Sequence, residues 1–399
     1  MLMRAGAIWA LSVTGVAAQA NPPLMIPPVP DRPLVRPAAE ILSYAAPGAS
    51  VECGNGPART VDAPAPPPSV GRPSMLPPVL ERAGGSPRPR TDSYSYRFDV
   101  AADGRTTSIR REPRPTETYD FEGQAVEAVI AGWRFASGAA RTGCRYEARA
   151  ERTPVSAAPR SLLLRVMGEN RSGYGREEML AAVRRPDADC SRHRPDPRLL
   201  AYPPFDDIPA LPGRRDWTML EYDLDAGGRP RGVRTGASSG NTALDRAGRE
   251  ALERSRFEPG ARRGCEWGYH KTAPDLPAPP RPDIANFVRP GDDCPNEENR
   301  QGRVKLVNGE ALYPPEFRAR NIMGWAIVRF DVASWGAIGP AEVVAAEPAW
   351  AIGQAAQTVV RTARAEPGPG WRGCLQPVLF QISDEDAPAA GSARDLTLR

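Results

Sequence analysis

Residues 236–240, Gly-Ala-Ser-Ser-Gly, are the stretch of the chain most similar to a catalytic motif. In a nucleophile elbow, a serine between two glycines lies on a tight turn from a strand into a helix. Ser238 would be the nucleophile and His270, further along the chain, would be its base. The alternative is a helix start, in which a serine or Asn241 accepts hydrogen bonds from the free N–H groups of the first turn. The sheet that this region predicts is small for a hydrolase, so we predict no catalytic residue.

The sequence also lacks the residue patterns that metal and cofactor sites require. His193 and His270 are the only histidines, and they lie in different parts of the chain. No two cysteines have the spacing of two to four residues that zinc sites prefer, and no glycine-rich phosphate loop occurs. We therefore expect no metal, no cofactor and no small-molecule substrate.

Six cysteines instead predict disulfides, although six allow fifteen pairings. Three of the cysteines each follow a glycine. Each of the other three lies earlier in the chain, before a Pro-Pro pair. If equivalent positions have equivalent roles, the pairs are Cys53–Cys144, Cys190–Cys265 and Cys294–Cys374. A loop of this size destabilises the unfolded chain by roughly 4.5 kcal/mol per bridge in the chain-entropy model.

The cysteines belong to a pattern that occurs three times. Each copy has a Pro-Pro pair, a strand that alternates apolar and polar residues and carries an aspartate, a glycine turn and a Gly-Cys pair. The aspartate precedes the turn glycine by five positions every time: Asp99 and Gly104, Asp223 and Gly228, Asp331 and Gly336. The first Pro-Pro pair is Pro77-Pro78, and the others follow Tyr202 and Tyr313. The chain is therefore expected to contain three divergent copies of one unit.

Each copy predicts strand, turn, strand, helix and closing strand. In the first copy we expect a second strand at 106–111 and a helix whose apolar face runs from Val126 to Trp133. A short helix is also expected at 315–320 in the third copy, whereas Pro209 and Pro212 would interrupt it in the second. The fold class is α+β: three tandem small domains, each an antiparallel sheet backed by one or two helices.

The ranges between the copies have their own signals. Residues 1–20 resemble a cleavable secretory signal peptide, although a retained membrane anchor is the alternative. Proline-rich residues 21–90 predict an extended spacer with a short ordered piece near 41–53. The copies then span 91–153, 190–273 and 294–383, separated by an insert at 154–189 and a proline-rich linker at 274–293, with a tail at 384–399. In the insert we expect a strand at 161–167 and a short helix at 176–184.

Charge adds a further limit. The net charge is +4, from 52 basic and 48 acidic residues that are spread along the chain. This distribution does not suggest a nucleic-acid partner or a polybasic membrane patch. Membrane contact is expected only if residues 1–20 stay attached.

The second and third copies resemble the TonB C-terminal domain. The residues that carry the resemblance are the Tyr-Pro pairs at 202 and 313, the aspartate strand, the glycine turn and the Glu-Pro-Gly sequences at 258–260 and 366–368. The first copy matches only in its strand, its helix and Trp133-Arg134-Phe135. The resemblance implies a periplasmic, non-enzymatic domain that contacts an extended segment of outer-membrane transporters.

Strand addition at a sheet edge is the binding mode that the resemblance implies. The corresponding edge here is the closing strand of the third copy, and the residues expected to meet the partner are Leu375, Val378, Leu379, Phe380 and Ile382. Pro377 suits an edge, because its missing donor must face away from the paired strand. The alternative is that residues 384–399 cover this strand.

The resemblance leaves two functions of different kinds. A cleavable N-terminus and three copies favour a periplasmic binding protein for an envelope or outer-membrane protein segment. A membrane-anchored, TonB-type energy transducer is the alternative, and a hydrolase through Ser238 is the third.

Overall fold

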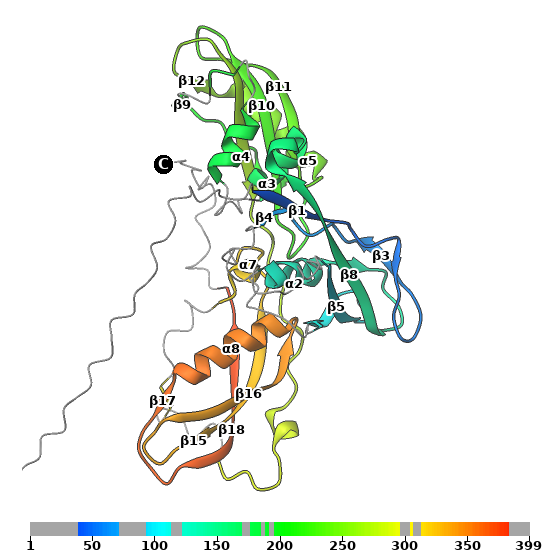
Figure 1. Cartoon of the computed structure of the whole chain (residues 1–399), viewed down its shortest axis with the longest axis vertical. Helices are drawn as coiled ribbons and strands as arrows, with labels where there is room; N and C mark the ends of the chain where they lie inside the picture. Colours follow the sequence, from blue (N-terminus) through cyan, green and yellow to red (C-terminus); the bar gives the residue numbers. More distant parts are fainter. Residues whose placement is uncertain are drawn as a thin grey trace, which may run out of the picture. The chain divides into compact units, whose positions relative to one another are not determined.

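The computed structural model of the chain describes residues 39–71, 93–112, 122–169, 176–184, 188–190, 195–295, 304–305 and 313–382. Within these ranges the fold is mixed α+β, with mostly antiparallel sheets and few helices (Figure 1). The predicted signal peptide, the tail at 384–399 and the first Pro-Pro pair lie outside the described residues. We call residues 39–154 the first segment, 190–273 the second segment and 294–382 the third segment.

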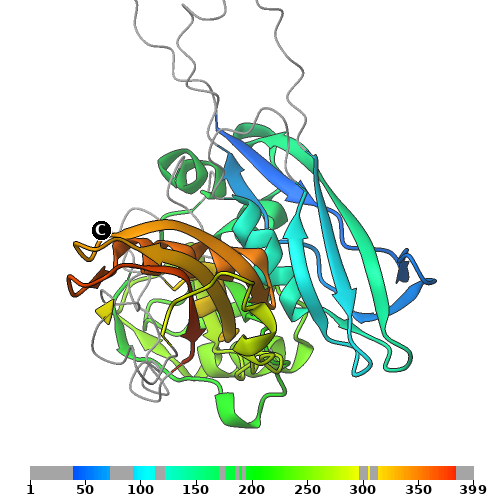
Figure 2. The same cartoon turned by 90° about the horizontal axis from the view of Figure 1, so that it is seen from below.

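The first segment is built on a five-stranded sheet in the order β4-β1-β8-β5-β6 (Figure 2). Its members are β1 (Glu40–Tyr44), β4 (Ser69–Gly71), β5 (Ser93–Val100), β6 (Thr106–Arg111) and β8 (Arg141–Pro154). Tyr96, Phe98 and Val100 alternate with polar residues on β5 and are buried. Helix α2 (Glu122–Gly132) contacts β6 and contributes buried residues to the same core.

The ordered part of the proline-rich region is larger than the sequence predicts. Beyond β1 and β4, it contains β2 (Ser50–Val51) and β3 (Ala58–Asp62), and β3 pairs with β7 (Arg134–Phe135). Prolines 66 to 68 are buried, and the indole Nε1–H of Trp133 donates to the Pro64 carbonyl at 3.0 Å. A spacer was expected here because proline lacks a ladder donor. The prediction failed because carbonyls and ring surfaces of prolines still pack against a folded neighbour.

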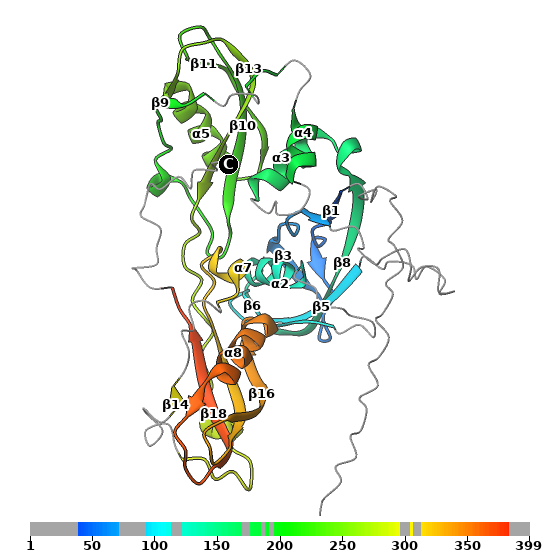
Figure 3. The same cartoon turned by 60° about the vertical axis from the view of Figure 1, so that its left-hand side comes forward.

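The second segment has a three-stranded sheet in the order β11-β10-β13. Its strands are β10 (Asp216–Leu224), β11 (Pro230–Ser238) and β13 (Arg262–Lys271), and helix α5 (Thr242–Arg254) packs on β10 and β11 (Figure 3). A two-stranded sheet joins β9 (Pro197–Leu199) to β12 (Arg256–Phe257). A short 3-10 turn, η2 (Phe205–Asp207), follows Tyr202-Pro203-Pro204 in place of a helix, as the later prolines predict.

The insert between the first and second segments corrects one prediction. Residues 161–167, expected to be a strand, lie in helix α3 (Arg160–Gly168), whereas the helix expected at 176–184 is α4 (Arg176–Val183). A short apolar run does not distinguish a strand from a buried helix by its periodicity. Packing decides here: Leu163, Leu164 and Val166 form a buried cluster with Trp217 and Met219 of β10. The helix therefore covers a face of the second sheet.

The third segment repeats the three-stranded arrangement as β16-β15-β18. Its strands are β15 (Gly324–Val332), β16 (Ile338–Glu347) and β18 (Trp371–Phe380), and helix α8 (Trp350–Thr362) packs on β15 and β16. The short helix expected after the Pro-Pro pair is α7 (Pro315–Arg318). A small sheet pairs β14 (Val304–Lys305) with β17 (Arg364–Ala365).

The first and third segments share one cluster of buried side chains. It joins residues of β5 and α2 to residues of α7, β15 and α8, including Phe98, Ile130, Trp133, Phe317, Phe330 and Ile352. The central core of the second segment is a separate cluster around Leu220, Tyr222, Leu252 and Phe257. The sequence pattern predicts three similar units but not this sharing, because repeat spacing carries no information on which units touch.

Candidate partner-binding edge

The start of each closing strand (β8, β13 and β18) is fixed by the same aspartate and glycine. The aspartate of the first hairpin strand accepts a hydrogen bond from the N–H of the glycine that precedes the second cysteine. The three bonds are each 2.8 Å long: Gly143 to Asp99, Gly264 to Asp223 and Gly373 to Asp331. These glycines have φ values of 63°, 66° and 67°, in the left-handed region that favours glycine. The closing strand therefore enters each sheet in the same way.

The three disulfides are Cys53–Cys144, Cys190–Cys265 and Cys294–Cys374, the predicted pairs. Beside each bridge, a backbone bond holds the chain near the first cysteine against the closing strand. The donors are Gly54, Cys190 and Asp293, and the acceptors are the carbonyls of Thr142, Arg263 and Arg372 at 2.8, 3.3 and 3.3 Å. The first residues of each closing strand are thus covered on one side.

In the first segment this cover reaches both ends of the strand. β1 pairs antiparallel with residues 150–154 of β8. Nearer the start of β8, the N–H of Arg145 donates to the Glu52 carbonyl at 3.0 Å, and the Tyr146 hydroxyl donates to the Ala45 carbonyl at 2.6 Å. Residues 40–54 therefore run antiparallel to β8. An extended chain segment can occupy the edge of a closing strand in this fold.

β18 lies at the end of its sheet. It pairs with β15, and among the described residues no other strand pairs with it. Of the predicted partner-binding residues, Leu375, Val378 and Phe380 are buried, Leu379 is 55% exposed, and Ile382 lies two residues past the strand and is partly exposed. Three of the five residues thus belong to the core. A partner at this edge would meet the backbone, Leu379 and Ile382.

Pro377 limits what the β18 edge can donate. It lies opposite Ile327 of β15 and has no N–H, so it is tolerated in a sheet where the missing donor faces outward. Its carbonyl accepts a hydrogen bond from Nε2 of Gln376 at 3.0 Å. Because backbone direction alternates along a strand, the N–H of Leu379 points to the same side as the Pro377 nitrogen. A strand added here would lose one bond at Pro377 and find a donor at Leu379.

β13 is the equivalent strand of the second segment, and it lies at the end of its sheet in the described part of the chain. Gly268 stands three residues after Cys265, as Pro377 stands three residues after Cys374. The β13 edge therefore keeps the donor that β18 lacks. We did not predict this edge from the sequence, although the aligned Gly-Cys pairs contain the signal.

The proline-rich linker covers one face of the third sheet and reaches the edge of β18 at Asp293. The indole Nε1–H of Trp325 donates to the Pro279 carbonyl at 2.7 Å, and η3 (Ile284–Phe287) packs beside β18. At the end of the linker, Asp292 forms an ion pair with Arg329 of β15. The hydrogen bond from Arg329 lowers the pKa of Asp292 from its usual value, with help from the Arg289 N–H. The linker is thus tied to the sheet at both ends.

The structure places Ser238 at the end of β11, three residues before the N-cap of α5. Its hydroxyl donates to Oδ2 of Asp245 at 2.9 Å and accepts from the Gly240 N–H at 3.1 Å, while the Asn241 side chain caps α5. His270 lies 2.8 Å from the Gly168 carbonyl through Nε2. Burial lowers its pKa to about 4. The two residues of the hydrolase hypothesis are thus each bound to other partners.

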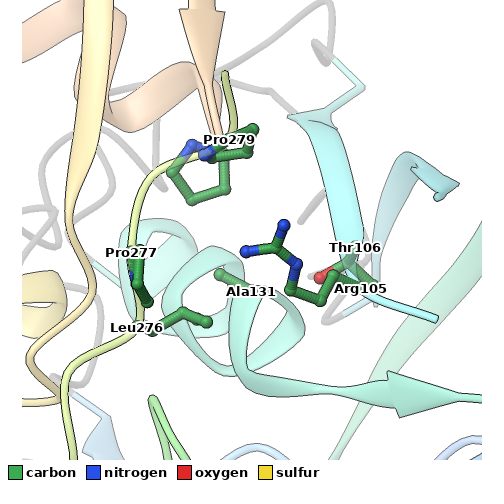
Figure 4. Close-up of a pocket in the computed structure, with 7 residues that line it drawn as sticks. Arg105, Thr106, Ala131, Leu276, Pro277 and Pro279 are labelled. Carbon is green, nitrogen blue, oxygen red and sulfur yellow. The ribbon is translucent and has the colours of Figure 1, made fainter. Parts of the chain in front are cut away.

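The pocket shown in Figure 4 is a packing gap between the first segment and the linker. Its lining residues are Arg105, Thr106 at the start of β6, Ala131 of α2, Leu276, Pro277 and Pro279 of the linker, and Pro348 of the third segment. Its free volume is about 10 Å³, roughly the space that one water molecule needs. It therefore has no room for a small-molecule substrate.

Three further observations concern the described residues and the whole sequence. No described helix is long and apolar enough to cross a membrane. The described side chains include no group of three or more histidine, cysteine, aspartate or glutamate residues placed to hold a metal ion. The chain matches no protein-family model and no curated protein.

Proposed function

We propose that the chain is an exported, non-enzymatic binding protein made of three TonB C-terminal-like modules. It recognises an extended segment of an envelope or outer-membrane transport protein by strand addition. The partner class comes from the sequence resemblance. The binding mode has independent support from the geometry of the closing strands.

The observation that carries the proposal is the cover of β8. Residues 40–54 lie antiparallel along this closing strand, whereas the equivalent strands β13 and β18 end their sheets in the described part of the chain. Main-chain hydrogen bonds at such an edge give affinity, and neighbouring side chains give selectivity. The same fold thus offers a filled edge in one segment and edges suited to a partner in the others.

Three related modules are supported by repeated local geometry. The turn glycines 104, 228 and 336 have φ values of 84°, 75° and 83°. Each accepts a 2.9 Å hydrogen bond from the short strand that follows the helix, through the N–H of Phe135, Phe257 or Ala365. Together with the aspartate–glycine bonds and the three bridges, these contacts support a common turn and closing strand in each segment.

Export is supported by the disulfides, which persist in oxidising compartments. N-terminal sequencing of the protein purified from envelopes tests this part. A chain that begins at Asn21 agrees with an exported binding protein, whereas a chain that keeps residues 1–20 supports the anchored transducer.

Site-specific photo-crosslinking in intact envelopes tests the binding mode. We would place the crosslinker at exposed Gln381, just past β18, with exposed Glu253 of α5 as the control position. The proposal expects capture of one envelope protein through an extended segment from Gln381 and no such product from Glu253. Equal products from both positions, or none from Gln381, would contradict it at β18.

Two variants at Leu379 sharpen the experiment. Leu379→Pro removes the outward donor, while Leu379→Thr keeps it and makes a comparable loss of apolar surface. Capture should be lost in the first variant and retained in the second. Deleting residues 384–399 tests the alternative in which the tail covers the strand, because capture would then increase.

A further inference from the structure

The first and third segments meet around a buried carboxylate that caps a helix of the other segment. Glu127 of α2 is only 5% exposed, and its Oε2 accepts the Ala351 N–H at 2.9 Å. Ala351 is in the first turn of α8, whose N-cap residue, Ala349, provides no side-chain cap. Glu127 therefore satisfies a free donor at a helix start that has no cap of its own.

A second carboxylate makes the reciprocal contact. Glu347 ends β16, and its two oxygens accept from the N–H and the hydroxyl of Ser108 on β6, at 2.8 and 3.0 Å. Ser108 has a φ of 53°, which is uncommon for a residue other than glycine. Each segment thus contributes one carboxylate that binds backbone of the other.

Uncharged contacts complete this junction. The N–H of Ile109 donates to the Pro348 carbonyl at 2.9 Å, and Ile109 and Ala349 form an isolated parallel bridge. The guanidinium of Arg110 lies 4.4 Å from the centre of the Trp350 ring, a cation–π distance. Residues 347–349 therefore occupy the outer edge of β6.

The charged groups around the two carboxylates only partly offset their burial. Burial raises the pKa of Glu127 to about 7. The backbone hydrogen bonds from Ala351 and Arg111 and the charge of Arg111 lower this pKa, but by less than burial raises it. Burial also raises the pKa of Glu347, against the two bonds from Ser108. Asp99 adds to that increase, and Arg110 opposes it. Both carboxyls are therefore protonated more readily in the folded chain than they would be in water.

We propose that residues 108–111, Glu127 and residues 347–351 form a pH-responsive clasp, which closes the first segment on the third at acidic pH and opens as the pH rises. A neutral carboxyl still accepts a backbone N–H, and it avoids the cost of burying a charge. An ionised carboxyl regains its hydration when the segments separate. Opening would release the edge of β6 and the first turn of α8.

The clasp does not depend on the proposed partner or on strand addition at β18. It rests only on the contacts between the first and third segments. Its biological consequence would be a change in which sheet edges are accessible, because β6 has a covered edge only while the clasp is closed.

Hydrogen exchange of the full chain with intact disulfides tests the clasp. The probes are the amides of Ile109 and Ala351, which both donate across the junction, and the amides of β10 are the reference. After correction for intrinsic exchange between pH 5 and 9, the clasp amides should lose protection up to about pH 7. The ordinary and raised pKa values of Glu127, 4.5 and about 7, give an opening constant that grows roughly 75-fold between pH 5 and pH 9.

Glutamine variants identify the groups responsible. Glu127→Gln keeps an acceptor without the charge, so protection at pH 9 should approach its pH 5 value, and Glu347→Gln should have a smaller effect in the same direction. Glu253→Gln, on the exposed face of α5, should behave as the wild type. A flat wild-type profile would overturn the clasp even if the variants fail to fold. A wild-type slope that persists in both clasp variants would overturn it too.

Discussion

Replacing the turn glycine of the second segment by alanine should destabilise that segment strongly. Gly228 joins β10 to β11 with a φ of 75°, and its carbonyl accepts the Phe257 N–H at 2.9 Å. A methyl group at this position would lie 2.2 Å from the Phe257 carbonyl oxygen and 2.7 Å from that of Glu258. Both oxygens belong to backbone, so β12 must move away from the turn.

Gly232, four residues later, is a matched control. Its φ is 62°, and a methyl group there would have no atom within 4 Å. Gly232→Ala should therefore cost only the left-handed conformation, about 1 kcal/mol. Gly228→Ala adds the lost hydrogen bond, about 1 kcal/mol, and displacement of buried Phe257, which together give a loss of roughly 3 to 4 kcal/mol.

Hydrogen exchange of the β10 and β13 amides would measure both variants, because these amides report on the second segment alone. Protection should fall about 30-fold further in Gly228→Ala than in Gly232→Ala, from the difference of about 2 kcal/mol. Equal losses in the two variants would refute the reasoning, since they would mean that the close approach of β12 costs nothing.

Three further changes in the second and third segments test other contacts. Asp223→Ala removes the acceptor for the Gly264 N–H and should lower the urea midpoint by the equivalent of about 1 kcal/mol, while Asp223→Asn should restore part of it. Replacing Cys294 and Cys374 together by serine opens an 80-residue separation and should lower the unfolding free energy of the third segment by about 4.5 kcal/mol. Because burial lowers the pKa of His270 to about 4, stability of the second segment should be full above pH 6.5 and should fall by at most about 3 kcal/mol towards pH 4. Thermal melting across this range would show a flat profile for His270→Gln if the histidine is responsible.

Features that local sequence determines were predictable. The strand expected at 106–111 is β6 with the same bounds, and the helix expected after Pro314 is α7. The disulfide pairs were predictable because the Gly-Cys pairs recur at nearly equal distances from the strand aspartate. Glycine turns and alternating strands need only near neighbours to form.

Features that depend on packing between distant residues were not predictable. Residues 161–167 form a helix because the face of β10 offers Trp217 and Met219 to a buried apolar run. Gly168 allows that approach, since a methyl group there would lie 2.2 Å from the Trp217 ring. The sequence of residues 161–167 alone does not indicate this packing partner.

The closing strand of the third copy was predicted in position, whereas the burial of its side chains was not. Leu375, Val378 and Phe380 satisfy the sheet's own core, because alternate side chains of an edge strand face the two sides of the sheet rather than its open edge. The end of the sheet presents backbone, so for the proposed strand addition the missing donor at Pro377 matters more than the apolar residues around it. This also explains why Gly268 makes β13 a comparable candidate.

The chain upstream of each first cysteine lies differently against each described sheet. In the first segment, residues 40–54 lie along the edge of β8. In the second, α3 and α4 precede Cys190, and α3 lies on a face of the β11-β10-β13 sheet. In the third, the linker lies on a face of the β16-β15-β18 sheet. The turn and closing strand are the same in all three segments, so the flanking sequence, rather than the repeated unit, determines whether another described strand pairs with the closing strand.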